Sequence, residues 1–152
     1  MRKWLKHLKN QKGLTLIELL AVVVILGIIA AIAVPAIGNI IDNSKKDAHV
    51  SNALLIINAA KLADVSNNQT VKTDLTGSNG VKLSVLETQG FLDAIPKDPD
   101  AENNTYVDAN SFVKKNGNKY EIYLDGSKND VGTSAVPATE KNLNSNGKGQ
   151  IK

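Results

Sequence analysis

Residues 12–37 read KGLTLIELLAVVVILGIIAAIAVPAI, and the long apolar run within them is the main indication of the fold. The segment from Leu14 to Val34 is an apolar run that only Thr15, Glu18 and Gly27 interrupt. At about 1.5 Å of rise per residue, a run of this length forms a helix roughly 31 Å long, which matches the hydrocarbon core of a bilayer. The run therefore predicts one membrane-spanning helix.

Charge is distributed unevenly around this run. The net charge of +3 comes from the first 13 residues, which hold five basic residues and no acid. The other residues hold 13 lysines, no arginine and 15 acids. Basic residues next to a span stay on the cytoplasmic side, so we expect residues 1–13 in the cytoplasm and the chain after Pro35 outside. The exported part is weakly acidic, which argues against direct DNA binding.

Glu18, Gly27 and Pro35 distinguish the run from an ordinary membrane anchor. A carboxylate inside a span costs free energy and marks a candidate functional site. It needs a cationic partner, and an amino terminus created by cleavage just before the run would supply one. Gly27 lowers helix propensity and Pro35 removes a helical hydrogen bond, so the helix is expected to loosen between them. A secretory signal peptide fits less well, because its apolar region is shorter and lacks an acid.

The stretch from Lys12 to Ile37 resembles the N-terminus of type IV pilins and of the pseudopilins of type II secretion and competence systems. The resemblance implies that a prepilin peptidase cuts after Gly13 and that Leu14, the new first residue, is N-methylated. Leu14 stands where the family usually has phenylalanine. The absence of cysteine excludes the C-terminal disulfide of many Gram-negative pilins, which favours a pseudopilin or a Gram-positive pilin.

The same resemblance implies an assembly mechanism and its partners. Glu18 would recruit subunits against a neighbouring amino terminus, and the helix would loosen at Gly27 and Pro35 as subunits leave the membrane for the filament. The expected partners are further copies of the chain, a prepilin peptidase and N-methyltransferase, and an assembly platform protein with its ATPase. The expected location is the plasma membrane first and a cell-surface filament afterwards.

Residues 36–125 have the patterning of a globular pilin domain. We expect the helix to continue from residue 36 to about residue 64, and the polar segment 65–80 to be a loop. Ser84 and Glu87 have capping-box spacing, which predicts a short helix that Gly90 ends. The segment 90–99, GFLDAIPKDP, resembles one that leads into the sheet of major pseudopilins and Gram-positive pilins.

The pair Asn116-Gly117 predicts a β-hairpin between strands at 112–115 and 120–124. Residues 105–107 are expected to add a third strand. One long helix packed on a small antiparallel sheet gives the α+β class of the type IV pilin fold. Residues 126–152 are rich in Gly, Asn, Ser and Lys, so we expect a polar tail of coil, part of it mobile.

No catalytic constellation is recognisable, so we do not expect an enzyme. His7 lies in the leader and His49 on a polar part of the helix, and both are expected to be solvated. Asp125 and Asp130 lie where major pseudopilins bind calcium, which makes this loop a candidate calcium site, with solvated turn carboxylates as the alternative. No other cofactor or metal is expected.

The sequence therefore predicts a structural subunit that is made as a membrane prepilin. Residues 1–13 are a leader that is removed, and residues 14–35 form the membrane-spanning and filament-core helix. The subunit belongs to a pilus, or alternatively to the pseudopilus of a secretion or DNA-uptake system. An alternative of another class is a membrane-anchored extracellular binding domain that does not polymerise.

Overall fold

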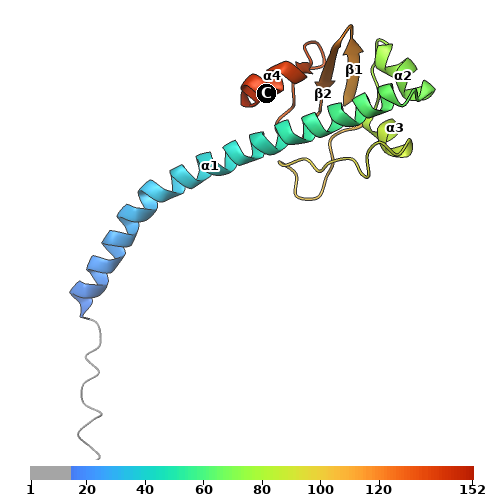
Figure 1. Cartoon of the computed structure of the whole chain (residues 1–152). Helices are drawn as coiled ribbons and strands as arrows, with labels where there is room; N and C mark the ends of the chain where they lie inside the picture. Colours follow the sequence, from blue (N-terminus) through green and yellow to red (C-terminus); the bar gives the residue numbers. More distant parts are fainter. Residues whose placement is uncertain (1–14) are drawn as a thin grey trace, which may run out of the picture. The chain divides into compact units, whose positions relative to one another are not determined.

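The computed structural model describes residues 15–152, and Figure 1 traces its elements. Gly13 and Leu14 lie outside the described residues. The chain divides between Ile40 and Ile41 into two units. Helix α1 (Leu16–Val65) begins in the first unit and ends in the second.

The first unit contains the apolar half of α1. Residues 16–40 are helical throughout, and every large apolar side chain among them is between 49% and 86% exposed. The helix is long and apolar enough to cross a membrane. A helix that is apolar on all sides needs lipid or other protein surface to cover it. The prediction of a long apolar N-terminal helix is confirmed.

The second unit combines the rest of α1 with short helices and one antiparallel sheet. Its elements after α1 are α2 (Gln69–Thr76), α3 (Leu83–Thr88), β1 (Phe112–Asn116), β2 (Lys119–Tyr123), β3 (Ala138–Thr139), α4 (Glu140–Asn146) and a 3-10 helix (Gly147–Gln150). The strand order is β1-β2-β3, and both neighbouring pairs are antiparallel. These elements confirm the predicted α+β class.

The second half of α1 lies beside the sheet (Figure 1). Buried apolar residues of this half of the helix and of the sheet belong to one hydrophobic core. The helix contributes five completely buried residues at spacings of three or four: Ala53, Ile56, Ile57, Ala60 and Ala63. Three of the five are alanines. Val113 of β1 and Ile122 of β2 are completely buried on the facing side. The stripe along α1 has the period of a helix packed on one side.

The hairpin predicted at Asn116-Gly117 is confirmed. Asn116 pairs with Lys119, so Gly117 and Asn118 form a two-residue loop. Gly117 has a φ of 60°, a conformation that glycine adopts without steric cost. The turn residues thus fix the register of β1 against β2.

The third strand lies elsewhere than predicted. Residue Thr105 makes only an isolated bridge to Lys97, whereas β3 pairs with β2 through Ala138 and Thr139. The prediction of a strand at 105–107 is therefore wrong. A strand of two residues leaves no alternating pattern in the sequence, so β3 could not be recognised from it.

The segment 65–80 is not a loop throughout, because it contains α2. Asn68 caps this helix by accepting a hydrogen bond from the Val71 backbone N–H at 3.1 Å. Val71 and Leu75, four positions apart, are buried in the core. Two apolar anchors and a cap hold a helix of eight residues that is otherwise polar.

The short helix expected near Ser84 is present as α3, but its cap comes from elsewhere. Asp108 accepts hydrogen bonds from the backbone N–H and the hydroxyl of Ser84, at 2.8 and 2.7 Å. Gly90 follows the helix with a φ of 77°. A carboxylate 24 residues away thus replaces the local capping box that Ser84 and Glu87 predict.

The expectation of coil for residues 126–152 is wrong. This segment holds β3, α4 and the 3-10 helix, and Leu143 and Ile151 are almost completely buried. Val131 bridges both Leu124 and Ile151, which joins the end of the chain to the sheet region. Thr139 caps α4 by accepting from the Asn142 backbone N–H. A few apolar residues and one cap thus order a polar segment through long-range pairing.

Candidate functional site

A capping box closes the N-terminal end of α1. The hydroxyl oxygen of Thr15 accepts a hydrogen bond from the Glu18 backbone N–H at 3.3 Å. Oε2 of Glu18 accepts from the Thr15 backbone N–H and hydroxyl, at 2.7 and 2.8 Å. These contacts satisfy donors that the first helical turn leaves free. The T-x-x-E spacing of Thr15 and Glu18 is the sequence signal for this cap, which was not among the expectations above.

The capping contacts leave the Glu18 carboxylate accessible. Both contacts to the carboxylate go to Oε2, and the residue is exposed. An amino group of another chain can therefore approach without breaking the cap. The role of Glu18 in assembly stays a prediction, as do cleavage after Gly13 and methylation of Leu14.

Gly27 and Pro35 both lie inside α1, which continues through them. Within the described part of the chain, no atom lies within 4 Å of the position that a Cβ on Gly27 would take. Space alone therefore does not require glycine there. Loosening of the helix between these residues stays a prediction.

Asp125 and Asp130 hold the loop after β2 through separate contacts. Asp125 accepts a hydrogen bond from the Asn110 side chain. Asp130 accepts from the Gly126 backbone N–H at 3.0 Å and from the Tyr123 hydroxyl at 3.2 Å. Both carboxylates therefore stabilise the loop, and calcium binding there stays a prediction.

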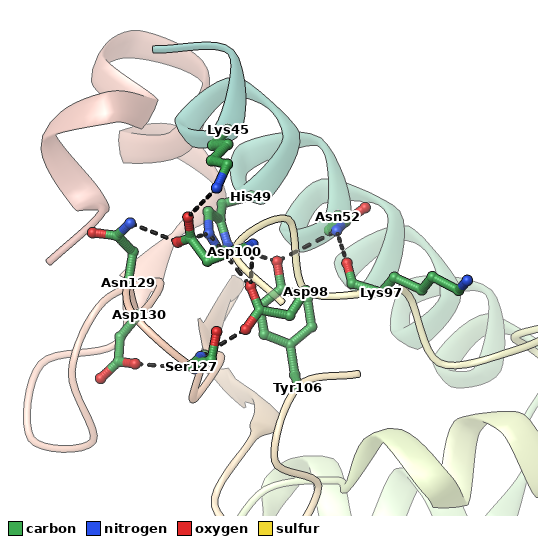
Figure 2. A network of polar contacts seen from close by, with 11 residues as sticks. Lys45, His49, Asn52, Lys97, Asp98, Asp100, Tyr106, Ser127, Asn129 and Asp130 are labelled. Atoms are coloured by element: carbon green, nitrogen blue, oxygen red, sulfur yellow. Dashed lines mark hydrogen bonds and ion pairs between the residues drawn. The ribbon is translucent and has the colours of Figure 1, made fainter. Parts of the chain in front are cut away.

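A buried polar cluster surrounds His49 of α1 (Figure 2). His49 is completely buried, so the expectation that it is solvated is wrong. Its Nδ1 lies 2.7 Å from the Tyr106 hydroxyl, and its Nε2 lies 3.0 Å from Asp100 Oδ2 and 3.8 Å from Asp98 Oδ1. His7, the other histidine, lies outside the described residues.

The two carboxylates connect His49 to the loop after β2. Asp98 accepts from the Ser127 backbone N–H at 2.6 Å and from the Asp100 backbone N–H at 2.9 Å. Asp100 also accepts from the Asn129 side chain at 2.6 Å. The cluster therefore joins the helix, the turn near Asp98 and the 125–130 loop, three segments far apart in the sequence.

The charges of this cluster partly compensate each other. Burial raises the pKa of Asp100, but hydrogen bonds from His49 and Asn129, together with the nearby ammonium of Lys45, outweigh burial and hold that pKa below its ordinary value. The ammonium of Lys45 lies 3.4 Å from Asp100 Oδ1. Burial raises the pKa of Tyr106 far above its usual range, so its hydroxyl keeps its proton. Asp100 is thus an ionised group in a buried site.

The sequence contained one indication of the buried histidine. His49 precedes Ala53, Ile56 and Ala60 by four, seven and eleven positions, so it lies on the same helix face as the core stripe. The adjacent charged residues Lys45, Lys46 and Asp47 instead suggested an exposed part of the helix. Its partners are 51 and 57 residues away in the chain and only folding brings them together.

Comparisons with known proteins agree with the N-terminal motif. Residues 8–34 match the family model described as the prokaryotic N-terminal methylation motif. The chain is 27% identical over 140 residues to the type II secretion system core protein G of Vibrio cholerae serotype O1, covering 86% of this chain and 92% of that protein. It is 36% identical over 107 residues to the type IV major fimbrial protein FimA of Dichelobacter nodosus, covering 70% of this chain and 50% of that protein. No solved structure matches significantly.

The family model and both relatives support the type IV pilin and pseudopilin family for this chain. The N-terminal motif and the two relatives support a pilin-like filament subunit. The matched motif includes Gly13, Leu14 and Glu18, the positions at which we predict processing and assembly. The chain spans almost the whole secretion protein but only half of the fimbrial protein.

Proposed function

We propose that the chain is made as a membrane prepilin, is cut after Gly13, and polymerises through α1 into a filament on the cell surface. A prepilin peptidase would free and methylate Leu14, and an assembly platform with its ATPase would extract the subunits. The observation that carries the proposal is the apolar half of α1, whose large side chains are all at least 49% exposed. Lipid covers such a helix before assembly, and helices of other subunits cover it afterwards.

The proposal assigns the Glu18 carboxylate to the amino terminus of a neighbouring subunit. In lipid or in a filament core, an unpaired carboxylate is costly, so pairing with an amino group favours assembly. Thr15 already holds Oε2 of this carboxylate at 2.7–2.8 Å, which fixes its orientation before a neighbour arrives. The hydrogen bonds between Thr15 and Glu18 thus cap the helix and also orient the carboxylate that would bind the next subunit.

Substitutions at the N-terminal end of α1 test this assignment in cells that make no other copy of the subunit. Glu18→Gln can still accept the capping hydrogen bonds but carries no charge, so we expect membrane insertion with few or no filaments. Thr15→Ala keeps the charge and loses the side-chain cap, so we expect filaments at reduced yield. The measurement is electron microscopy and immunoblotting of the sheared surface fraction against the membrane fraction.

Glu87→Ala is the matched control, because it removes an exposed carboxylate from α3. We expect it to leave filament yield unchanged. Normal filaments with Glu18→Gln would show that charge pairing at this residue does not drive assembly.

Processing is tested separately by intact mass and N-terminal sequencing of the sheared protein. A chain that begins at Leu14, with or without one methyl group, supports peptidase cleavage. A chain that begins near Val34 would indicate a cleaved secreted domain. A chain that begins at Met1 and stays in the membrane fraction would favour the anchored binding domain and contradict the filament.

A pseudopilin is the second candidate, because the chain spans 92% of the type II secretion protein. In that case the filament would be short and would serve secretion or DNA uptake. Deleting the gene at native expression separates the two candidates. Loss of long surface filaments supports a pilus, whereas a secretion or uptake defect without visible filaments supports a pseudopilus.

The proposed role is structural rather than enzymatic. Neither relative is named as an enzyme. Calcium at Asp125 and Asp130 is a separate proposal, supported by two carboxylates in one short loop. A melting temperature that EDTA leaves unchanged would dismiss it.

A further inference from the structure

The cluster around His49 has the donor set of a metal site. One nitrogen and two carboxylates, from His49, Asp98 and Asp100, offer ligand atoms that all lie within 4.8 Å of one another. Zinc binds histidine nitrogen and carboxylate oxygen at about 2.0–2.2 Å, so two ligands of one ion lie no more than about 4.4 Å apart. His49 Nε2 lies 3.0 Å from Oδ2 of Asp100 and 3.8 Å from Oδ1 of Asp98, and both distances are within that limit.

Two further observations favour a cation at this cluster. The Asp100 side chain is only 1% exposed. Within residues 15–152, its Oδ1 is buried and has no hydrogen-bond partner. The Tyr106 hydroxyl lies 2.7 Å from His49 Nδ1, which leaves Nε2 facing the carboxylates. A hydrogen bond to the other ring nitrogen is the usual way in which proteins orient a metal-binding histidine.

We propose that His49, Asp98 and Asp100 bind one divalent transition-metal ion of the zinc type. Imidazole together with carboxylates suits such an ion better than calcium or magnesium, which bind oxygen ligands. Three protein ligands leave a further position for water. This site is distinct from the loop carboxylates Asp125 and Asp130, and it does not depend on filament formation.

Lys45 occupies the approach to this site. Its ammonium lies 3.4 Å from Asp100 Oδ1, and its side chain is 37% exposed, so it can move into solvent. Binding replaces the ammonium at this oxygen by the metal ion. Because the two cations compete, removing the lysine charge is expected to strengthen metal binding.

The bound ion would stabilise the fold by joining distant segments. His49 belongs to α1, whereas Asp98 and Asp100 contact Ser127 and Asn129 in the loop after β2. An ion that binds only the folded chain raises its stability by mass action. The structure thus predicts a metal-dependent connection between α1 and the C-terminal part of the chain.

The test uses the full chain in detergent, with any affinity tag removed and with His7→Gln in every sample so that His49 is the sole histidine. After EDTA treatment and dialysis, ZnCl₂ is titrated by calorimetry, and melting is followed with and without the metal. We expect one ion per chain and a higher melting temperature. Lys45→Met should tighten binding at least about tenfold, and Asp98→Asn should weaken it at least about a hundredfold.

Lys119→Met is the matched control, since it removes an exposed lysine from the hairpin and should leave binding unchanged. Circular dichroism checks that Asp98→Asn folds, and Lys45→Met tests the proposal independently. The absence of saturable binding in both the parent chain and Lys45→Met would overturn the proposal. Binding that survives Asp98→Asn but is lost with Asp130→Asn would place the ion in the loop and would also overturn it.

Discussion

At the scale of single residues, the Tyr106 hydroxyl connects two side chains of α1. It lies 2.7 Å from His49 Nδ1 and accepts a hydrogen bond from Asn52 at 3.3 Å. The tyrosine is 2% exposed, so water cannot easily replace these contacts. A buried donor or acceptor that loses its partner costs more than the bond itself contributes.

Tyr106→Phe should therefore destabilise the chain by about 1–3 kcal/mol, because it leaves a buried histidine nitrogen without its partner. Tyr123→Phe is the matched control, since that hydroxyl makes a longer, 3.2 Å contact to Asp130 at a partly exposed position. We expect a change within about 0.5 kcal/mol for the control. Urea unfolding of the full chain in detergent measures both, and equal losses would contradict the role of the buried hydroxyl.

At the scale of elements, the ordering of the C-terminal segment depends on a close approach at Gly132. Its φ is 73°, and its backbone N–H donates to the Gln150 carbonyl at 2.8 Å. A Cβ at this position would lie 2.6 Å from the Ala138 backbone nitrogen, where β3 begins. Glycine is thus required here both for its backbone conformation and for its lack of a side chain.

Gly132→Ala should destabilise the chain strongly, and Gly90→Ala is its matched control. Gly90 has a similar φ of 77°, but no described atom lies within 4 Å of its Cβ position. We expect a cost of about 1 kcal/mol for Gly90→Ala, from backbone conformation alone. The overlap with β3 should add at least about 2 kcal/mol for Gly132→Ala. Thermal melting of both variants measures the loss of stability. Similar losses would show that the backbone next to Gly132 can move to make room for a side chain.

At the scale of the second unit, two polar clusters join α1 to later segments of the chain. One is the His49 cluster, and the other surrounds Asp64 near the end of the helix. Hydrogen bonds from Lys115 and then Tyr120, at 2.6 and 2.7 Å, hold the pKa of Asp64 below its ordinary value of 3.8. Burial, together with Asp64, raises the pKa of Tyr120 to about 12, so the phenol stays a donor at neutral and acidic pH.

These carboxylates predict acid sensitivity. Because the folded pKa values of Asp64 and Asp100 lie below the unfolded value of 3.8, their stabilisation is complete above that pH. It is lost as the pH falls through 3.8 toward the folded values. Urea unfolding at neutral pH and in steps below 3.8 should show this decline, and Asp64→Asn should make it shallower. Asp74→Asn, an exposed acid on α2, is the control and should follow the parent profile.

Features that depend on neighbours along the chain could be predicted from the sequence. The apolar run from Leu14 to Val34 specifies a long helix because hydropathy acts residue by residue, and Asn116-Gly117 specifies the hairpin because the turn needs a positive φ. The local motif that includes Gly13 and Glu18 also indicated the protein family. For these features, a short window of sequence contains the whole physical cause.

Features that depend on residues far apart in the chain could be recognised only in the folded structure. Asp108 caps α3 from 24 residues away, and Ile151 is ordered through a bridge to Val131. His49 looked solvated because its polar neighbours are adjacent, whereas its buried partners Asp100 and Tyr106 follow 51 and 57 residues later. Polar side chains can be buried only when such partners meet, and no local pattern specifies which partners those will be.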